Sequence, residues 1–237
     1  MAKAGKITSA PRKVAIFDVD GTIFRSSLLI ELVETLIERG IFPEETWKSY
    51  ADEEKRWLER TGEYEAYMMA VVDAFRSNIK GVHYADFADI SDEVVARYRN
   101  RVYRHTRDLV KELKQKGYFL LAISQSPKTV VEGFCKRMGF NKVYGRVYEL
   151  GPGDRFTGNI MDMHLIENKA NIVRRAVERE GLTLKGSYGV GDTEGDISML
   201  ELVERPIAFN PNAKLYRYAR RMGWRIVVER KDVIYKF

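Results

Sequence analysis

Short apolar runs alternate with amphipathic stretches along most of the chain. Val14–Phe17 and Tyr118–Ile123 are near-continuous apolar runs, as expected for strands that are buried on both faces of a parallel sheet. Over Ser27–Ile37 apolar residues recur at helical spacing, and Gly40 and Pro43 end this predicted helix. The chain therefore begins with a buried strand followed by an amphipathic helix.

The second half of the chain repeats this alternation of strands and helices. The predicted elements are, in order, helix Thr106–Lys116, strand Tyr118–Ile123, helix Lys128–Met138, a hairpin of Lys142–Glu149 and Phe156–Met161, helix Lys169–Glu180, strand Ser187–Gly191, helix Asp196–Val203, strand Pro206–Phe209, helix Asn212–Met222 and strand Arg225–Glu229. Such a succession predicts an α/β fold with a doubly wound parallel sheet.

The stretch between these two parts is different because it contains no convincing strand. It is rich in Trp, Tyr, Glu, Lys and Arg, and its pattern predicts three amphipathic helices over Glu44–Arg60, Gly62–Asn78 and Ser91–Arg104. We therefore expect a core of residues 1–24 and 105–237, with residues 25–104 forming a helical insertion after the first strand.

Composition excludes several classes of protein. The chain has 237 residues, of which 45% are hydrophobic and 31% charged, and this rules out collagen-like and disordered proteins. The one cysteine, Cys135, indicates neither a disulfide framework nor a cysteine metal site. The polar stretch Met1–Lys13 lacks the apolar segment of a secretory signal, and no apolar run reaches the roughly 18 residues of a membrane span. We expect a cytoplasmic protein.

The net charge of +6 allows two interpretations. It could mark a nucleic-acid surface, or it could simply favour anionic substrates. Lys and Arg are dispersed among Glu residues, and the densest basic stretch, Arg97–Arg107, falls on a predicted helix. This distribution argues against a nucleic-acid partner. The pattern contains no indication of an oligomeric state.

Polar side chains follow three of the predicted strands, and a lysine opens a helix nearby in the fold. In open parallel sheets, ligands bind beyond the carboxyl ends of the strands. We expect six side chains to meet at that edge: Asp18, Asp20, Ser124, Lys169, Asp192 and Asp196.

The carboxylates in this group suit a metal ion. Asp18 and Asp20 are spaced i, i+2 at the end of a strand and therefore point the same way. Their charges repel unless a hard cation neutralises them, and Asp192 supplies a third carboxylate from another loop. Mg²⁺ prefers a few carboxylates together with water and phosphate oxygens. Gly21 allows the sharp turn after the second aspartate.

A phosphate group would also find donors at this edge. Lys169, together with the hydroxyl and backbone N–H groups around Ser124 and Gln125, could hold phosphoryl oxygens. Structural roles remain open for the same residues. The aspartates could form turns or helix caps, Ser124 could belong to a turn, and Lys169 could be a solvated helix lysine.

Four segments, taken in order, resemble the four motifs of the haloacid dehalogenase superfamily. They are Asp18–Thr22, Ile123–Ser124, Asn168–Ala170 and Gly191–Asp196. The helical insertion, and the hairpin that contains Phe156–Gly158, are similar to the phosphoserine-phosphatase-like branch, in which the insertion forms a cap.

This resemblance implies an Mg²⁺-dependent phosphatase that acts on a small organic phosphate monoester through an aspartyl-phosphate. Asp18 would be the nucleophile and a metal ligand. Asp20 would protonate the leaving alkoxide and then activate water, while its backbone carbonyl binds the metal. Asp192 would bind Mg²⁺ directly, and Asp196 would act on it through water or have a purely structural role.

The resemblance also implies the phosphate-binding residues. They are Thr22, Ser124, Gln125 and Lys169, and Lys169 would in addition steady the nucleophile. The three histidines show no ligand spacing and are interpreted as non-catalytic: His83, His105 and His164.

Substrate choice is where the chain departs from the branch. Phosphoserine phosphatases generally carry a Glu at the position of Ser27, so phosphoserine itself is disfavoured here. Gly195 stands where related phosphatases often have Asn. A phosphomutase and a catalytically silent binding protein of the same fold remain alternatives, whereas Asp20 disfavours a dehalogenase.

The insertion offers two further sets of side chains. Its aromatic residues either pack a helical bundle or face the site and close over the substrate. These are Trp47, Tyr50, Trp57, Tyr64, Tyr67 and Phe75. Arg25, Arg56 and Arg60 could meet an extra anionic group on a substrate, or could be solvated.

Overall fold

The computed structural model describes residues 10–161 and 168–237, and its strands form one eight-stranded sheet. His164 and most of the N-terminal stretch discussed above lie outside these residues. The strands are β1 (Arg12–Phe17), β2 (Phe119–Pro127), β3 (Lys142–Leu150), β4 (Phe156–Met161), β5 (Leu182–Gly191), β6 (Arg205–Phe209), β7 (Arg225–Arg230) and β8 (Val233–Lys236). Their order across the sheet is β4-β3-β2-β1-β5-β6-β7-β8.

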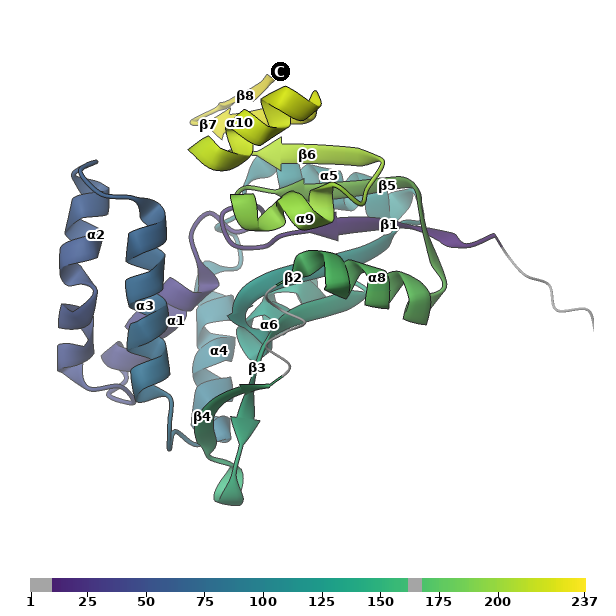
Figure 1. Ribbon diagram of the computed structural model, residues 1–237. Coiled ribbons are helices and arrows are strands. Elements are labelled where there is room, and N and C mark those ends of the chain that lie inside the picture. The colour runs from purple at the N-terminus through teal and green to yellow at the C-terminus, as the bar shows by residue number, and fades with distance from the viewer. Residues whose placement is uncertain (1–9, 162–167) are drawn as a thin grey trace, which may run out of the picture.

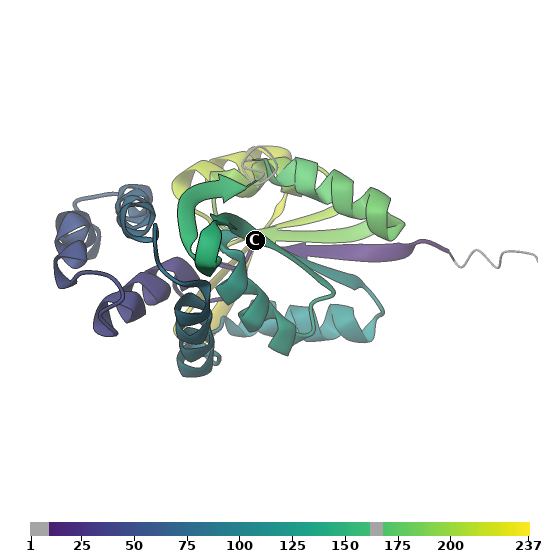
Figure 2. The same ribbon diagram turned by 90° about the horizontal axis from the view of Figure 1, so that it is seen from below.

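The six inner strands pair in parallel, while β4 and β8 pair antiparallel at the two edges. The predicted hairpin is the β3–β4 pair, and β8 was not predicted. Helices α5 (Arg104–Gln115) and α6 (Lys128–Met138) cover one face. Helices α8 (Lys169–Glu180), α9 (Ile197–Leu200) and α10 (Ala213–Met222) cover the other (Figure 2). The predicted doubly wound α/β fold is confirmed.

The alternation of side chains in β1 explains why both faces are covered. Val14 and Ile16 belong to the buried cluster that contains α8 and α9 residues, whereas Ala15 and Phe17 belong to the cluster on the α5 and α6 face. Successive side chains of a strand point to opposite faces, so a run that is apolar throughout needs helices on both sides. The strand therefore sits in the middle of the molecule.

The insertion consists of α1 (Leu28–Glu38), a 3₁₀ helix (Glu44–Ser49), α2 (Ala51–Leu58), α3 (Tyr64–Asn78) and α4 (Tyr84–Tyr98). The single helix expected over residues 44–60 is thus broken at Tyr50. The helix expected over residues 91–104 starts earlier, where the His83 side chain accepts a hydrogen bond from the Ala85 N–H at 3.1 Å and caps α4. Within the described residues no helix combines the length and apolarity that a membrane crossing requires.

The insertion leaves and rejoins the core at adjacent points. The Arg25 N–H donates to the Arg101 carbonyl at 2.9 Å, and the Tyr103 N–H donates to the Ile23 carbonyl at 2.9 Å. Phe24 forms an antiparallel bridge with Val102 between these two bonds. The two connections are therefore held side by side next to the end of β1. The division at residues 24/25 and 104/105 stays a prediction.

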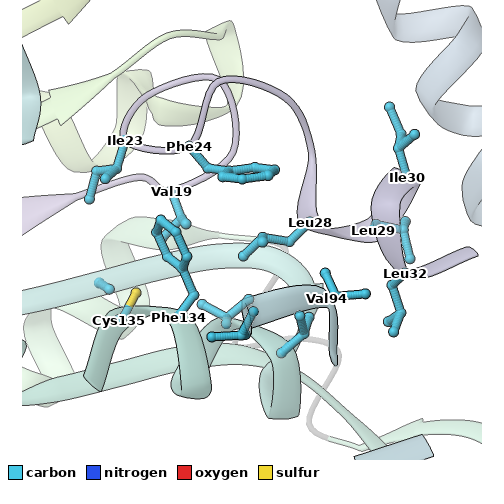
Figure 3. Close-up of a cluster of buried hydrophobic side chains, with 14 of the residues drawn as sticks. Val19, Ile23, Phe24, Leu28, Leu29, Ile30, Leu32, Val94, Phe134 and Cys135 are labelled. Atoms are coloured by element: carbon cyan, nitrogen blue, oxygen red, sulfur yellow. The ribbon is translucent and has the colours of Figure 1, made fainter. Parts of the chain in front are cut away.

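Helices α1 and α4 are anchored on the core by apolar contacts. Figure 3 shows Leu28 and Leu32 of α1 in one buried cluster with Val94 of α4 and with Phe134 and Cys135 of α6. Full burial of one such side chain stabilises the fold by about 1.5–3 kcal/mol. Helices α2 and α3 lie further from the sheet, at the left of Figure 1. The insertion thus has a fixed base and an outer helical pair.

Candidate active site

The end of β1 places Asp18 beside Lys169. The Asp18 N–H donates to the Val190 carbonyl of β5 at 2.9 Å, so the residue is fixed between two parallel strands. Lys169, at the start of α8, donates to Asp18 Oδ1 at 2.6 Å and to Asp196 Oδ1 at 2.5 Å. All three side chains are buried. Asp18 Oδ2 is buried too and has no hydrogen-bond partner among the described residues.

The electrostatics of this group are dominated by burial. Desolvation raises the pKa of Asp18 to about 7, although the Lys169 charge opposes the shift and Asp196 adds to it. Burial, followed by repulsion from Asp18 and Asp196, also raises the pKa of Asp192 well above its ordinary value. Burial lowers the pKa of Lys169, but attraction to Asp18 and Asp196 outweighs it and the net shift is upward. One lysine is too little positive charge for the two buried carboxylates of Asp18 and Asp196 and the half-buried one of Asp192.

The geometry fits a divalent metal ion. One carboxylate oxygen from each of Asp18, Asp192 and Asp196 lies within 4.8 Å of the others. Gly21 has a φ of +75°, and a Cβ built on it would lie 2.1 Å from Asp192 Oδ2, so only glycine lets this carboxylate approach the turn. Hard oxygen donors, one of them without a partner, are what Mg²⁺ binds.

Asp196 has a different environment from the other two carboxylates. Its Oδ1 accepts from Lys169, and its Oδ2 accepts from the backbone N–H groups of Asp192 at 2.9 Å and Thr193 at 3.0 Å. Both oxygens therefore already have donors. This arrangement fits a residue that holds Lys169 and shapes the loop, consistent with an action on the metal through water.

Asp20 is oriented by three hydrogen bonds. Its Oδ1 accepts from the Leu28 N–H at 2.6 Å, and its Oδ2 accepts from the hydroxyls of Ser124 at 2.6 Å and Ser126 at 2.9 Å. The carboxylate thus does cap the start of α1, as the structural alternative had it. It is also one of the six side chains predicted to meet at this edge of the sheet. We call this group the strand-end site: Asp18, Asp20, Ser124, Lys169, Asp192 and Asp196.

Comparison with known proteins decides the family. The family of haloacid dehalogenase-like hydrolases matches residues 15–201, which is most of the chain. This chain belongs to that family. A histidinol-phosphatase of Neisseria meningitidis is 26% identical over 229 residues, covering 91% of this chain and 98% of the relative. A phosphoserine phosphatase of Mycobacterium tuberculosis is 28% identical over 217 residues, covering 90% of this chain and 69% of the relative.

Solved structures agree with this membership at the level of the fold. A phospho-aspartyl intermediate analogue of phosphoserine phosphatase superposes with a TM-score of 0.59 at 22% identity, covering 94% of this chain and 95% of that one. The predicted family, its phosphoserine-phosphatase-like branch and the enzyme class of phosphatase are therefore confirmed.

Ser126 is the residue of this hydrolase's site that the sequence reasoning missed. Strand β2 continues to Pro127, so Ser124 and Ser126 point to one side of it and Gln125 to the other. Gln125 is exposed, and its side-chain oxygen accepts from Arg146 at 2.9 Å. Its side chain is thus directed elsewhere, and only its backbone N–H stays a candidate for phosphate. The i, i+2 spacing of the two serines was the available signal.

Two buried hydroxyls near the site have structural partners. The Thr22 hydroxyl donates to Asp192 Oδ1 at 3.3 Å, which links the first loop to the fourth motif. The Ser27 hydroxyl accepts from the Leu29 N–H at 3.2 Å and caps α1. No charge therefore occupies the position of Ser27. Thr22's contact with a phosphate stays a prediction.

Helix α3 approaches the strand-end site from the insertion. Lys214 of α10 forms ion pairs with Glu65 of α3 at 3.2 Å and with Glu194 of the fourth-motif loop at 2.6 Å. Burial raises the pKa of Tyr64, and the negative charges of Asp20 and Asp192 raise it further. The first turn of α3 is thus close to the carboxylates of the core.

Proposed function

We propose that this phosphatase hydrolyses small phosphate monoesters through an aspartyl-phosphate on Asp18, with Mg²⁺ as its cofactor. The arrangement of Asp18 carries the proposal: Lys169 holds one oxygen, the other is buried and has no hydrogen-bond partner among the described residues, and a carboxylate oxygen of Asp18 lies within 4.8 Å of one from Asp192. A carboxylate that only caps a helix or forms a turn needs no such environment.

The carboxylates of Asp18 and Asp192 and the backbone carbonyl of Asp20 would hold the metal, with Asp196 acting through water. When bound, Mg²⁺ supplies positive charge that lets these groups stay ionised next to an anionic phosphate. The upward pKa shifts of Asp18 and Asp192 support a site that needs this added charge.

The side chains of the strand-end site have distinct tasks in two steps. An oxygen of Asp18 bonds to phosphorus while the bond from phosphorus to the substrate alkoxide breaks, and Asp20 gives that alkoxide a proton. Water then bonds to phosphorus, its proton passes to Asp20, and the bond to Asp18 breaks to release inorganic phosphate. Such covalent catalysis replaces one difficult step by two easier ones, and acid–base help contributes roughly 10²–10⁴-fold.

Other residues of the site would position the phosphoryl oxygens. Lys169, Ser124, Thr22 and the backbone N–H of Gln125 are the proposed donors, and residues 25–104 would form a cap that excludes water. The hydroxyl of Ser126 keeps Asp20 in place. A cytoplasmic location remains a prediction.

Hydrolysis of p-nitrophenyl phosphate with and without Mg²⁺ tests this proposal. We expect metal-dependent turnover that Asp18→Asn lowers by at least about 10³-fold, because the nucleophile is lost. The matched control is Asp89→Asn, a change of the same chemistry on the exposed side of α4, which should keep full activity. Turnover that survives in Asp18→Asn would refute the mechanism. No turnover with any divalent metal would instead favour the silent binding protein.

A panel of phosphorylated metabolites, phosphoserine included, addresses the substrate. Relatives are named for phosphoserine and histidinol phosphate. The uncharged, buried Ser27 lacks the carboxylate expected to meet a substrate ammonium at that position. We expect phosphoserine to be a poor substrate, and its emergence as the best one would overturn this reading of Ser27.

A further inference from the structure

A cavity of about 470 Å³ lies among the inserted helices, and it has the size of a small-molecule site. Its aromatic wall comes from Trp57 of α2, Tyr64 and Tyr67 of α3, and Tyr98 at the end of α4. The ring centroids of Trp57 and Tyr64 are 5.1 Å apart, and those of Tyr64 and Tyr67 are 6.3 Å apart. Four aromatic residues of the insertion therefore line a cavity, which we call the insertion cavity.

The polar lining of the insertion cavity is mainly acidic. Glu31 and Glu34 of α1 and Glu54 of α2 contribute three carboxyl groups, and Arg101 is the one basic side chain among the described lining residues. Arg101 forms an ion pair with Glu31. Across residues 10–161 and 168–237, neither Glu34 nor Glu54 has an ion-pair partner. Two carboxyl groups of the lining thus have no cation, and Glu54 accepts a hydrogen bond from the Tyr67 hydroxyl at 3.3 Å.

One lining residue of the insertion cavity is hydrogen-bonded to the loop that carries Asp20. Ser26 lines the cavity, and the Ser26 carbonyl accepts from the Gly21 N–H at 3.0 Å, in the turn that follows Asp20. The N–H of Leu28 donates to Asp20 itself. From there α1 advances by roughly 5 Å per turn, so Glu31 and Glu34 follow about one and two turns beyond the acid–base residue. This is the span of a small ester with a phosphate at one end.

Tyr64 connects the two regions. It belongs to the wall of the insertion cavity, and the charges of Asp20 and Asp192 act on its hydroxyl. An aromatic face attracts a cation, most strongly when carboxylates stand nearby and water is partly excluded. A positively charged group in the cavity would therefore meet both aromatic rings and carboxyl groups that have no cation among the described residues.

We propose that the insertion cavity binds a cationic group of the substrate, so that the preferred substrates are phosphate monoesters of amino alcohols or of other organic cations. This inference rests on the proposed phosphatase activity and names the class of its substrate. Of the arginines considered as anion sites, Arg25 stacks on Tyr103, Arg56 pairs with Glu53, and Arg60 stacks on Trp57 of the cavity wall. Among the described lining residues the one basic side chain is Arg101, which is paired with Glu31.

Matched substrate pairs test the inference. Each ω-aminoalkyl phosphate of two to five carbons is compared with the alkyl phosphate in which methyl replaces the ammonium. For the pair of best-fitting length, we expect the amine to have a kcat/KM about tenfold or more higher. The double variant Glu34→Gln/Glu54→Gln should reduce this ratio about tenfold. A ratio of two substrates does not depend on how much of the enzyme is folded.

Glu59→Gln is the control, because Glu59 directly follows α2 but is exposed and does not line the cavity. It should leave the ratio as in the wild type. If p-nitrophenyl phosphate is hydrolysed but no aminoalkyl phosphate is preferred over its matched alkyl phosphate, the cavity inference is wrong and the phosphatase proposal stands. A preference that persists in the double variant also overturns it. Absence of any hydrolysis would refute the proposed function itself.

Discussion

The strand-end site and the insertion cavity both collect carboxyl groups, but the strand-end site supplies most of them with hydrogen-bond or ion-pair partners. At the strand-end site, Lys169 bridges Asp18 and Asp196, and two hydroxyls and one backbone N–H donate to Asp20. In the insertion cavity, which aromatic rings also line, Glu31 is the one carboxyl group with a cation among the described residues.

The difference suggests a division of labour. Groups that must react are held in fixed positions by partners, since catalysis depends on preorganised polar groups. Groups that recognise a substrate can be left short of partners, because the ligand supplies what is missing. The cost is stability in the free enzyme, as is common at functional sites.

Removing the internal cation of the strand-end site gives the largest expected effect on stability. Lys169→Met leaves Asp18 and Asp196 buried without their partner, and breaking such a buried pair costs about 3–5 kcal/mol in the free energy of unfolding. Urea unfolding followed by tryptophan fluorescence measures this loss. Asp196→Asn in the Lys169→Met background should recover part of it, since one uncompensated charge is removed. A loss below about 1 kcal/mol would mean that the lysine does not neutralise the site.

Removing one of the hydrogen bonds to Asp20 should have a smaller effect than Lys169→Met, and this effect should be on the catalytic rate. Ser126→Ala removes one hydrogen bond to a charged oxygen, worth roughly 1.5 kcal/mol, so we expect kcat to fall about tenfold. Ser77→Ala, on the exposed face of α3, is the matched control and should have no effect. Unchanged kcat in Ser126→Ala would show that Ser124 and Leu28 suffice to orient the carboxylate.

Neutralising the insertion cavity should do the opposite of Lys169→Met and stabilise the fold. Burial, then repulsion from Glu31, Glu54 and Glu38, raises the pKa of Glu34 from 4.5 to about 7, and Arg101 opposes this only weakly. A raised acid pKa means that stability is lost as pH rises from below 4.5 through about 7.

Glu34→Gln removes that loss. Because Glu34 is partly exposed and screened, we expect a gain of only about 1 kcal/mol at pH 8, and a smaller gain at pH 5. Thermal unfolding of variant and wild type at the two pH values measures the difference. A gain that is largest at pH 5 would contradict the stated direction of the shift.

The strand-end site could be predicted because its geometry follows from strand ends. A buried parallel strand fixes where its next residue lies, so Asp18, Ser124 and Asp192 could be brought together from sequence alone. Lys169 was found through its motif. The sequence predicts that β2 ends at Ile123, whereas the strand continues to Pro127. For this reason neither the role of Ser126 nor the direction of the Gln125 side chain could be predicted.

The insertion cavity could not be predicted in the same way. Amphipathic patterns find helices, but how the helices of residues 44–104 pack depends on contacts distant in sequence. Of the six aromatics singled out there, Trp57, Tyr64 and Tyr67 line the cavity, Tyr50 and Phe75 are buried, and Trp47 is exposed. The sequence spacing of these aromatic residues does not show which of them line the cavity, which are buried and which are exposed. Strand β8 has four residues and lies at the edge of the sheet, and its apolar run of three residues is too short to predict a strand.

The most direct measurement is the site of phosphorylation during turnover. Enzyme and substrate are mixed with Mg²⁺, quenched in acid, digested and examined by mass spectrometry. We predict one added phosphoryl group on the peptide that contains Asp18, lost on treatment with hydroxylamine and absent from Asp18→Asn. A phosphoryl group on another residue, or an active enzyme that never carries one, would contradict the assignment of Asp18 as the nucleophile.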